Sequence, residues 1–116
     1  MSSLNFKQGD VVVAPVPFSN QATAKLRPAL VMSPQDVNAR SDDLVVFKIT
    51  SKGRDYPFEV LLTEADVQNG KLKQESVVQI DFPVVIEQQA VKERVGNITS
   101  EKLAQVKQKT RSFYQL

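Results

Sequence analysis

The sequence predicts a mainly β fold, in which a small, strongly curved β-barrel carries short helices and one C-terminal α-helix. Three observations support this prediction. The apolar runs are short and rich in β-branched residues, as in Val11–Ala14 and Leu44–Ile49. The polar segments between them leave no room for the long crossover helices of a parallel sheet. An amphipathic helical pattern is confined to the end of the chain, from Thr99 onward.

The first two expected strands are Val11–Ala14 and Ala29–Met32, and a long polar loop joins them. The loop ends at Arg27, directly before Pro28. Because the residue before a proline favours extended geometry, we expect Arg27 at the mouth of the second strand with its guanidinium directed outward. Loops of this length in a compact domain are often functional, although a solvated arginine beside a strand would give the same local pattern.

Four further strands are expected along the chain. A third strand covers Leu44–Ile49 and a fourth covers Pro57–Leu62, each followed by a polar, turn-forming segment. Thr63 is expected to cap a short helix through Asp66. Pro83 cannot donate a ladder hydrogen bond, so we expect it to separate a fifth strand, Ser76–Phe82, from a sixth, Val84–Glu87.

The last expected element is an amphipathic α-helix that starts near Thr99. Its apolar side chains recur at three- and four-residue spacing and comprise Leu103, Val106, Thr110, Phe113 and Tyr114. An acidic residue in the first turn and basic residues toward the end suit the helix dipole. We interpret the basic end as dipole compensation on a solvated face.

Length and composition limit the possible functions. The chain has 116 residues, which predicts a single domain over residues 1–116. It has neither cysteine nor histidine, which excludes disulfides, thiolate metal sites and a histidine general base. No metal-binding motif is present, so we expect no metal and no cofactor. Without a leader or a long apolar run, we expect a cytoplasmic protein with no membrane partner. A net charge of +2 is too small to indicate nucleic-acid binding by itself.

Several segments, in this order, carry a family resemblance. They read GDVVVAPVPF, LRPALVMS, KITS, YPFEVLL, SVVQID and VGNITSEKLAQVKQKT. Together they resemble the MazF/PemK/Kid family of toxins from type II toxin–antitoxin systems. The resemblance implies an SH3-like barrel, a homodimer, and a metal-independent endoribonuclease that cuts single-stranded RNA at short sequences. It also implies a cognate antitoxin protein, with operator DNA bound only as a complex with that antitoxin.

The resemblance also implies an active site. An arginine before proline and a threonine at the end of the central strand form the recurrent pair of the family, and they match Arg27 and Thr50. Some members carry an Arg-x-Asp pair on a later strand. Here the matching residues are Gln79 and Asp81, so the carboxylate is kept and the arginine is replaced. A second arginine that often follows is replaced by Val84 or its neighbour.

The residues fit RNA cleavage by attack of a 2′-hydroxyl on the adjacent phosphorus. This reaction builds negative charge on the phosphate, which the always-protonated guanidinium of Arg27 can stabilise. Thr50 would donate to a phosphate oxygen, and Asp81 is the candidate base. Structural alternatives exist, because strand ends favour β-branched residues such as Thr50, and an aspartate before a Phe-Pro turn can bind backbone groups.

RNA binding would come from the loops around this site. Single-stranded RNA is held by charged contacts to its backbone and by stacking of bases on flat side chains. The candidates are Phe18, Lys25, Lys48, Ser51, Lys52, Arg54, Tyr56 and Gln79. A phenylalanine in a polar loop, such as Phe18, fits a stacking platform and a plug over one end of the barrel equally well.

Two other functions stay open. A binding module of the same fold that has lost cleavage would explain Gln79 and Val84 in place of arginines. The other open function is that of a protein-targeting toxin resembling the CcdB branch. That branch shares the fold and poisons DNA gyrase through its C-terminal helix. That branch lacks the RPAL and KITS features, so an endoribonuclease toxin is the preferred prediction.

Overall fold

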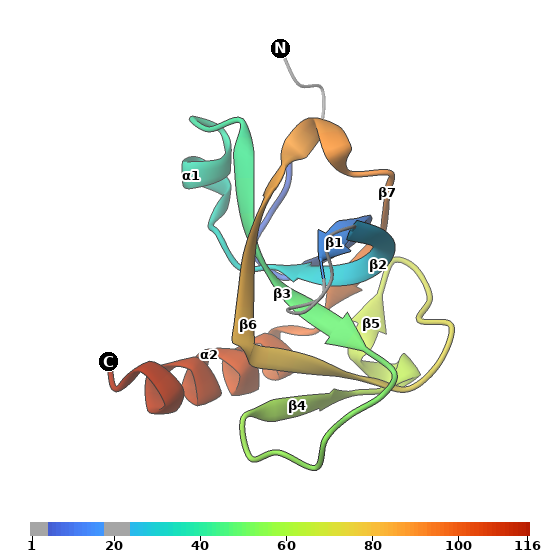
Figure 1. The fold of residues 1–116 in the computed structure, drawn as a ribbon, viewed down its shortest axis with the longest axis vertical. Coiled ribbons are helices and arrows are strands. Elements are labelled where there is room, and N and C mark those ends of the chain that lie inside the picture. Colours follow the sequence, from blue (N-terminus) through green and yellow to red (C-terminus); the bar gives the residue numbers. More distant parts are fainter. Residues whose placement is uncertain (1–4, 18–23) are drawn as a thin grey trace.

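A computed structural model describes residues 5–17 and 24–116. Seven strands form one antiparallel sheet in the order β4-β6-β3-β2-β1-β7-β5 (Figure 1). The strands are β1 Asp10–Pro17, β2 Ala24–Val31, β3 Asp43–Thr50, β4 Glu59–Leu62, β5 Val67–Gln68, β6 Ser76–Glu87 and β7 Glu93–Ile98. The helices are α1 Gln35–Asn38 and α2 Ser100–Tyr114, and Glu64–Asp66 and Gln88–Ala90 form 3₁₀ turns.

The mainly β fold with a C-terminal helix is confirmed, but a closed barrel is not. Strands β4 and β5 lie at the two edges of the sheet, and within the described residues they do not pair with each other. The strongly curved, SH3-like barrel therefore corresponds here to an open antiparallel sheet that is bent along β6. No helix in the described ranges is both long and apolar enough to cross a membrane.

The expected break at Pro83 was wrong, because β6 is one continuous strand of 12 residues. Its two halves pair differently. The first half pairs with β4 and the end of β3, and the second half pairs with the start of β3. The register shifts between Phe47 and Ile49. Figure 1 shows that β6 turns sharply along its length. This irregularity accommodates the missing N–H of Pro83, so the proline bends the strand without ending it.

The first hairpin extends further than the sequence predicted. Strand β1 runs to Pro17 and β2 begins at Ala24, so Arg27 lies inside β2 opposite Ala14 and not at a loop end. The pairing of β1 with β7 ends at Val13, and beyond it β1 pairs with β2 alone. A strand with one paired side tolerates prolines, which explains why Pro15 and Pro17 do not end β1.

Strands β5 and β7 were not predicted. Strand β7 contains Glu93, Arg94 and Gly96, so it lacks an apolar run. Gly96 has φ +149°, and an added Cβ would lie 2.7 Å from the carbonyl oxygen of Gln68. Glycine therefore permits the close approach of β5 to β7.

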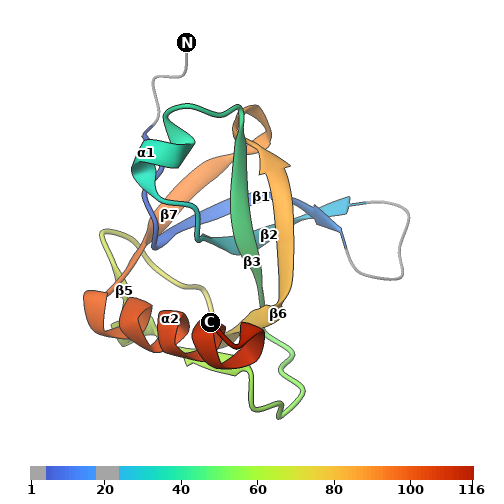
Figure 2. The ribbon, with the colours of Figure 1, turned by 90° about the vertical axis from the view of Figure 1, so that its left-hand side faces the viewer.

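The sheet is buried on both faces. Alternate residues of β3 enter different core clusters, with Leu44 and Val46 in one and Phe47 and Ile49 in the other. Helix α2 covers the second cluster through Val106, at the opposite end of the molecule from α1 (Figure 2). Its predicted start is confirmed, since the Thr99 side chain accepts from the backbone N–H of Lys102 at 3.1 Å.

Candidate functional site

Three predicted site residues share one face of two neighbouring strands. The β2–β3 pairing ends with Ala29 opposite Lys48. Two residues further along each strand, on the same face, lie Arg27 and Thr50. Antiparallel register thus directs the guanidinium, the ammonium of Lys48 and the hydroxyl to one side of the sheet. Arg27 and Thr50 are both half-buried.

Lys48 is a cation held inside this site. Its residue is 6% exposed, and its ammonium lies 4.4 Å from the centre of the Phe82 ring. Burial lowers the pKa of Lys48, the positive charges of Arg27 and Arg54 lower it further, and Asp81 opposes them. Two cations and one carboxylate, each from a different segment of the chain, therefore act on the ammonium of Lys48.

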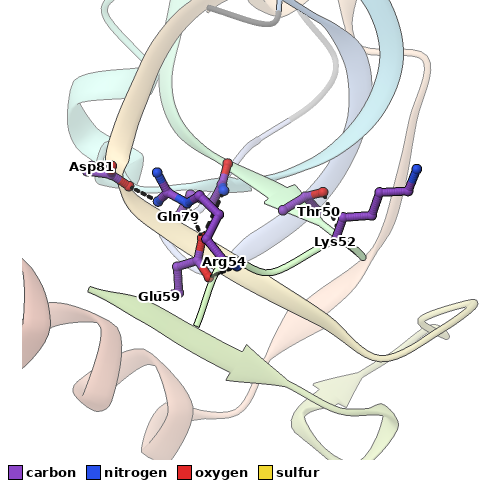
Figure 3. A network of polar contacts seen from close by, with 6 residues as sticks. All are labelled: Thr50, Lys52, Arg54, Glu59, Gln79 and Asp81. Carbon is purple, nitrogen blue, oxygen red and sulfur yellow. Dashed lines mark hydrogen bonds and ion pairs between the residues drawn. The ribbon is translucent and has the colours of Figure 1, made fainter. Parts of the chain in front are cut away.

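Arg54, in the loop between β3 and β4, is held by two carboxylates (Figure 3). Its Nε donates to Oε2 of Glu59 at 2.7 Å, and its terminal nitrogen donates to Oδ1 of Asp81 at 2.8 Å. The guanidinium also lies over the ring of Tyr56, 4.7 Å from its centre. These contacts raise the pKa of Arg54, with the Asp81 hydrogen bond the largest cause. Its side chain is still 47% exposed, so the cation remains accessible from solvent.

Glu59 is the anchor of this network, and no motif in the sequence singled it out. Its side chain is 4% exposed. It accepts hydrogen bonds from the backbone N–H of Arg54 at 2.8 Å, from the Arg54 guanidinium, and from Nε2 of Gln79 at 3.0 Å. Burial alone would raise the pKa of Glu59, but these donors together lower it below its usual value. The sequence signal that could have identified Glu59 is its charge at one position of a strand in which apolar residues alternate.

Gln79 and Asp81 lie two residues apart on β6 and face the same side of the sheet. Gln79 is paired with Glu59 across β4 and β6, and it is 6% exposed. Its Oε1 has no hydrogen-bond partner among the described residues. Asp81 engages Arg54 through Oδ1, and its side chain is 21% exposed. A cation therefore stands beside Asp81 although position 79 is uncharged.

The remaining predicted residues are less closely joined to the cluster. The Thr50 hydroxyl accepts from the backbone N–H of Lys52 at 3.2 Å, which organises the start of the β3–β4 loop. Ser51 is exposed in that loop, and Lys25 is exposed near the tip of the first hairpin. No hydrogen bond or ion pair among the described residues joins Ser51 or Lys25 to Arg54. Phe18 lies outside the described residues.

Helix α2 reaches the site through its last turn. Phe58 packs edge-on against both Tyr56 and Phe113, with ring centres 5.7 Å and 5.0 Å apart. The hydroxyl of Tyr114 donates to the carbonyl of Ile80 at 3.1 Å. Burial raises the pKa of Tyr114, and the neighbouring charge of Asp81 raises it further. The helical spacing predicted an apolar stripe that includes Tyr114 and gave no sign of this polar contact.

The arrangement offers fixed positive charge, a hydroxyl and a carboxylate on strands β2, β3 and β6 and on the β3–β4 loop. This set can bind a phosphodiester and stabilise charge that develops on it. Within residues 5–17 and 24–116, no three carboxylates gather in a way that would hold a metal ion.

Solved structures of toxins match the fold over nearly its whole length. MazF from Deinococcus radiodurans is 25% identical, with a TM-score of 0.78, and the match covers 98% of this chain and 100% of that chain. A MazE-MazF complex from Deinococcus radiodurans gives 26% identity, a TM-score of 0.76, and coverage of 97% and 99%. The Mycobacterium tuberculosis toxin MazF-mt6 is 20% identical, with a TM-score of 0.77 and coverage of 92% and 97%.

A search of curated protein sequences gives no match. The family model described as "PemK-like, MazF-like toxin of type II toxin-antitoxin system" matches residues 7–114. That range includes every element from β1 to α2 and all the residues of the site described above. This chain therefore belongs to the PemK-like, MazF-like toxin family of type II toxin–antitoxin systems.

Proposed function

We propose that the protein is a sequence-specific, metal-independent endoribonuclease toxin that cleaves single-stranded RNA. The observation that carries this proposal is the gathering of Arg27, Arg54 and Asp81 around Lys48, with Thr50 on the same face of the sheet as Arg27 and Lys48. A polyanion is the ligand that such a set of cations favours. Membership of the toxin family supports the same conclusion.

In the proposed mechanism the 2′-hydroxyl of one nucleotide attacks the adjacent phosphorus in line. Arg27 binds phosphate oxygens and stabilises the negative charge of the pentacoordinate species. Thr50 donates a hydrogen bond to a phosphate oxygen. Asp81 accepts the proton of the 2′-hydroxyl, and the 5′-oxygen leaves with a proton supplied by solvent or by the site. The products are a 2′,3′-cyclic phosphate and a 5′-hydroxyl.

The proposed RNA-binding residues surround this centre. Lys48 and Arg54 supply charge at the scissile phosphate, and the exposed Lys25, Ser51 and Lys52 would contact neighbouring nucleotides. Tyr56 offers an aromatic face on which a base can stack, and we propose base stacking for Phe18 as well. Gln79, which the sequence placed among the RNA contacts, is 6% exposed and donates to Glu59, so it would act on the RNA through Glu59 and Arg54.

The proposed protein partners are a cognate antitoxin and a second copy of the chain. Solved MazE-MazF complexes among the structural matches support the antitoxin. We propose a homodimer, with operator DNA bound only when the antitoxin is present. Light scattering on the purified chain should give twice its mass of 12.9 kDa, and a monomeric mass would contradict the dimer.

The decisive experiment incubates the full chain with labelled single-stranded RNA in EDTA. Wild type should cleave, and Arg27→Ala or Thr50→Ala should lower the rate by about 10²–10³-fold. Arg40→Ala, which removes an exposed arginine after α1, is the matched control and should cleave like wild type. RNA with a 2′-O-methyl group at the cut site should bind and stay intact. Tight binding without product would instead indicate a binding module, and gyrase inhibition without RNA cleavage a CcdB-like poison.

A further inference from the structure

We propose that Glu59 is a positioning residue of the site, and that it acts by holding the β3–β4 loop so that Arg54 faces Asp81. This inference rests on the proposed function and extends it to a residue that neither the motifs nor the family match assigned. Glu59 receives both the backbone N–H and the side chain of Arg54, so it fixes the loop and the guanidinium together.

The loop between β3 and β4 is exposed, and this carboxylate accepts the backbone N–H at its centre, that of Arg54. All residues from Ser51 to Pro57 are exposed. Asp55, next to Arg54, has φ +54°, a left-handed conformation that is unfavourable for a residue with a side chain. A charged acceptor beneath the loop offsets that cost, since hydrogen bonds to ionised groups are stronger than neutral ones.

Glu59 and Arg54 differ in how far their side chains are exposed to solvent, and this difference gives them different roles. At 4% exposure the Glu59 side chain is out of reach of RNA, whereas Arg54 is 47% exposed. Glu59 therefore acts through Arg54 and does not touch substrate. The same carboxylate accepts a hydrogen bond from Nε2 of Gln79, as Figure 3 shows. The amide nitrogen of Gln79 therefore faces Glu59, and its oxygen points away from Glu59. Gln79 is itself 6% exposed, so this hydrogen bond holds Glu59 in place beneath Arg54.

Arg54 consequently supplies the cation beside Asp81 at a site where position 79 is neutral. Its guanidinium is held at Asp81 on one side, at Glu59 on another, and over Tyr56. A side chain fixed in this way loses little further conformational entropy when a phosphate arrives. Preorganised charge of this kind contributes more to catalysis than the same charge on a free loop.

The test combines Glu59→Gln, Arg54→Ala and the double variant in the full chain. Glu59→Gln keeps the size of the side chain and removes its charge. We expect Glu59→Gln to lower kcat/KM for RNA cleavage by about 10- to 100-fold. If the loss appears in kcat for Arg54→Ala, it should appear in kcat for Glu59→Gln, and the same holds for KM. In the Arg54→Ala background, Glu59→Gln should change kcat/KM by less than about 2-fold, since its effect passes through Arg54.

Asp66→Asn is the matched control, because Asp66 is also a hydrogen-bonded carboxylate with a lowered pKa, and it binds Thr63 and Lys102 away from the site. It should alter stability and leave cleavage unchanged. Limited trypsin digestion gives a readout independent of activity. Glu59→Gln should speed cutting after Lys52 or Arg54 by about 10-fold or more, and Asp66→Asn should not.

The outcomes separate the two proposals. A cleaving wild type with unchanged kinetics and unchanged trypsin sensitivity in Glu59→Gln would overturn the role of Glu59 alone. Equal losses from Glu59→Gln with and without Arg54 would also overturn it, because Glu59 would then act by another route. A wild type that cleaves no RNA would overturn the nuclease proposal, and with it any role of Glu59 in cleavage.

Discussion

At the scale of single residues, similar carboxylates serve different ends according to their neighbours. Glu59 is bound by groups of the candidate site, and Asp66 is bound by groups that hold the fold together. Thr63 donates to Asp66 through both its backbone N–H and its hydroxyl, at 2.8 and 3.0 Å, and the ammonium of Lys102 lies 3.6 Å away. The capping box closes the turn before β5, and the ion pair with Lys102 links that turn to helix α2.

Asp66 is expected to stabilise the fold at neutral pH. Burial tends to raise the pKa of Asp66, but the Thr63 hydrogen bonds and the Lys102 charge lower it overall. A lowered carboxyl pKa gives stability that is present above the pKa of the unfolded chain and is lost as pH falls through the folded value. Asp66→Asn should therefore cost about 1 kcal/mol at neutral pH and less at an acidic pH below the pKa of the unfolded chain. Urea denaturation at both pH values measures this, and an equal loss at both would contradict it.

Lys48 illustrates a residue kept at a cost to stability. Its ammonium is buried near two arginines, and that environment disfavours the charged form. We expect Lys48→Met to leave the free energy of unfolding at neutral pH unchanged or higher, and to weaken binding of uncleavable 2′-O-methyl RNA by about 10-fold. Denaturation and a binding titration measure the two effects. A variant that loses stability and still binds RNA normally would contradict the assignment of Lys48 to the site.

At the scale of elements, α2 depends on one fully buried side chain. Val106 has no exposed surface and joins the core cluster that also contains Ile80 and Ile98. Polar contacts attach the helix nearer its ends, through the Thr99 cap, the Lys102–Asp66 ion pair and the Tyr114 hydroxyl. The middle of α2 is therefore attached to the sheet mainly by Val106 and its partly buried apolar neighbours.

Val106→Ala should lower the free energy of unfolding by about 2 kcal/mol, because two methyl groups leave the core and a cavity remains. Gln105→Ala, at the adjacent exposed position, should change it by less than about 0.5 kcal/mol. Thermal and urea denaturation of both variants provide the measurement. If both variants lost the same stability, the helix would be held by its ends and not by its centre.

Strand β6 links this architecture to the site. Its first half carries Gln79 and Asp81 beside β4, and its second half completes the other core cluster beside β3. The bend between the halves separates two cores and brings Asp81 under the β3–β4 loop, where Arg54 binds it. Pro83, which from the sequence indicated the end of a strand, belongs to the bend that shapes the site.

At the scale of the whole molecule, charge and family membership suggest an acidic protein partner. The chain has a sequence pI of about 9.0, and its candidate site gathers three cations. A small acidic antitoxin encoded beside this chain should suppress its effect on growth when both are expressed. Growth should arrest with the wild type alone and continue with Arg27→Ala, as colony counts after induction would show. A wild type harmless in this assay would count against a toxin.

Much of the fold followed from local pattern. Alternating and β-branched runs predicted β1 to β4 and the region of β6, and the Thr99 cap with its apolar spacing predicted α2. These signals are local because a strand or helix face repeats every two or about four residues. Strands β5 and β7 escaped prediction because their pairing rests on glycine and on close backbone approach, which leave no apolar pattern.

The sequence by itself determined most of the elements, the family, and the candidates Arg27, Thr50 and Asp81, because propensity and motif are properties of neighbouring residues. Tertiary structure decided which side chains meet. It placed Arg54 between Glu59 and Asp81 and buried Lys48 beside them, and it bent one strand where two were expected. Ion pairs between residues distant along the chain depend on strand register and on the bend of the sheet, and no local pattern encodes either one.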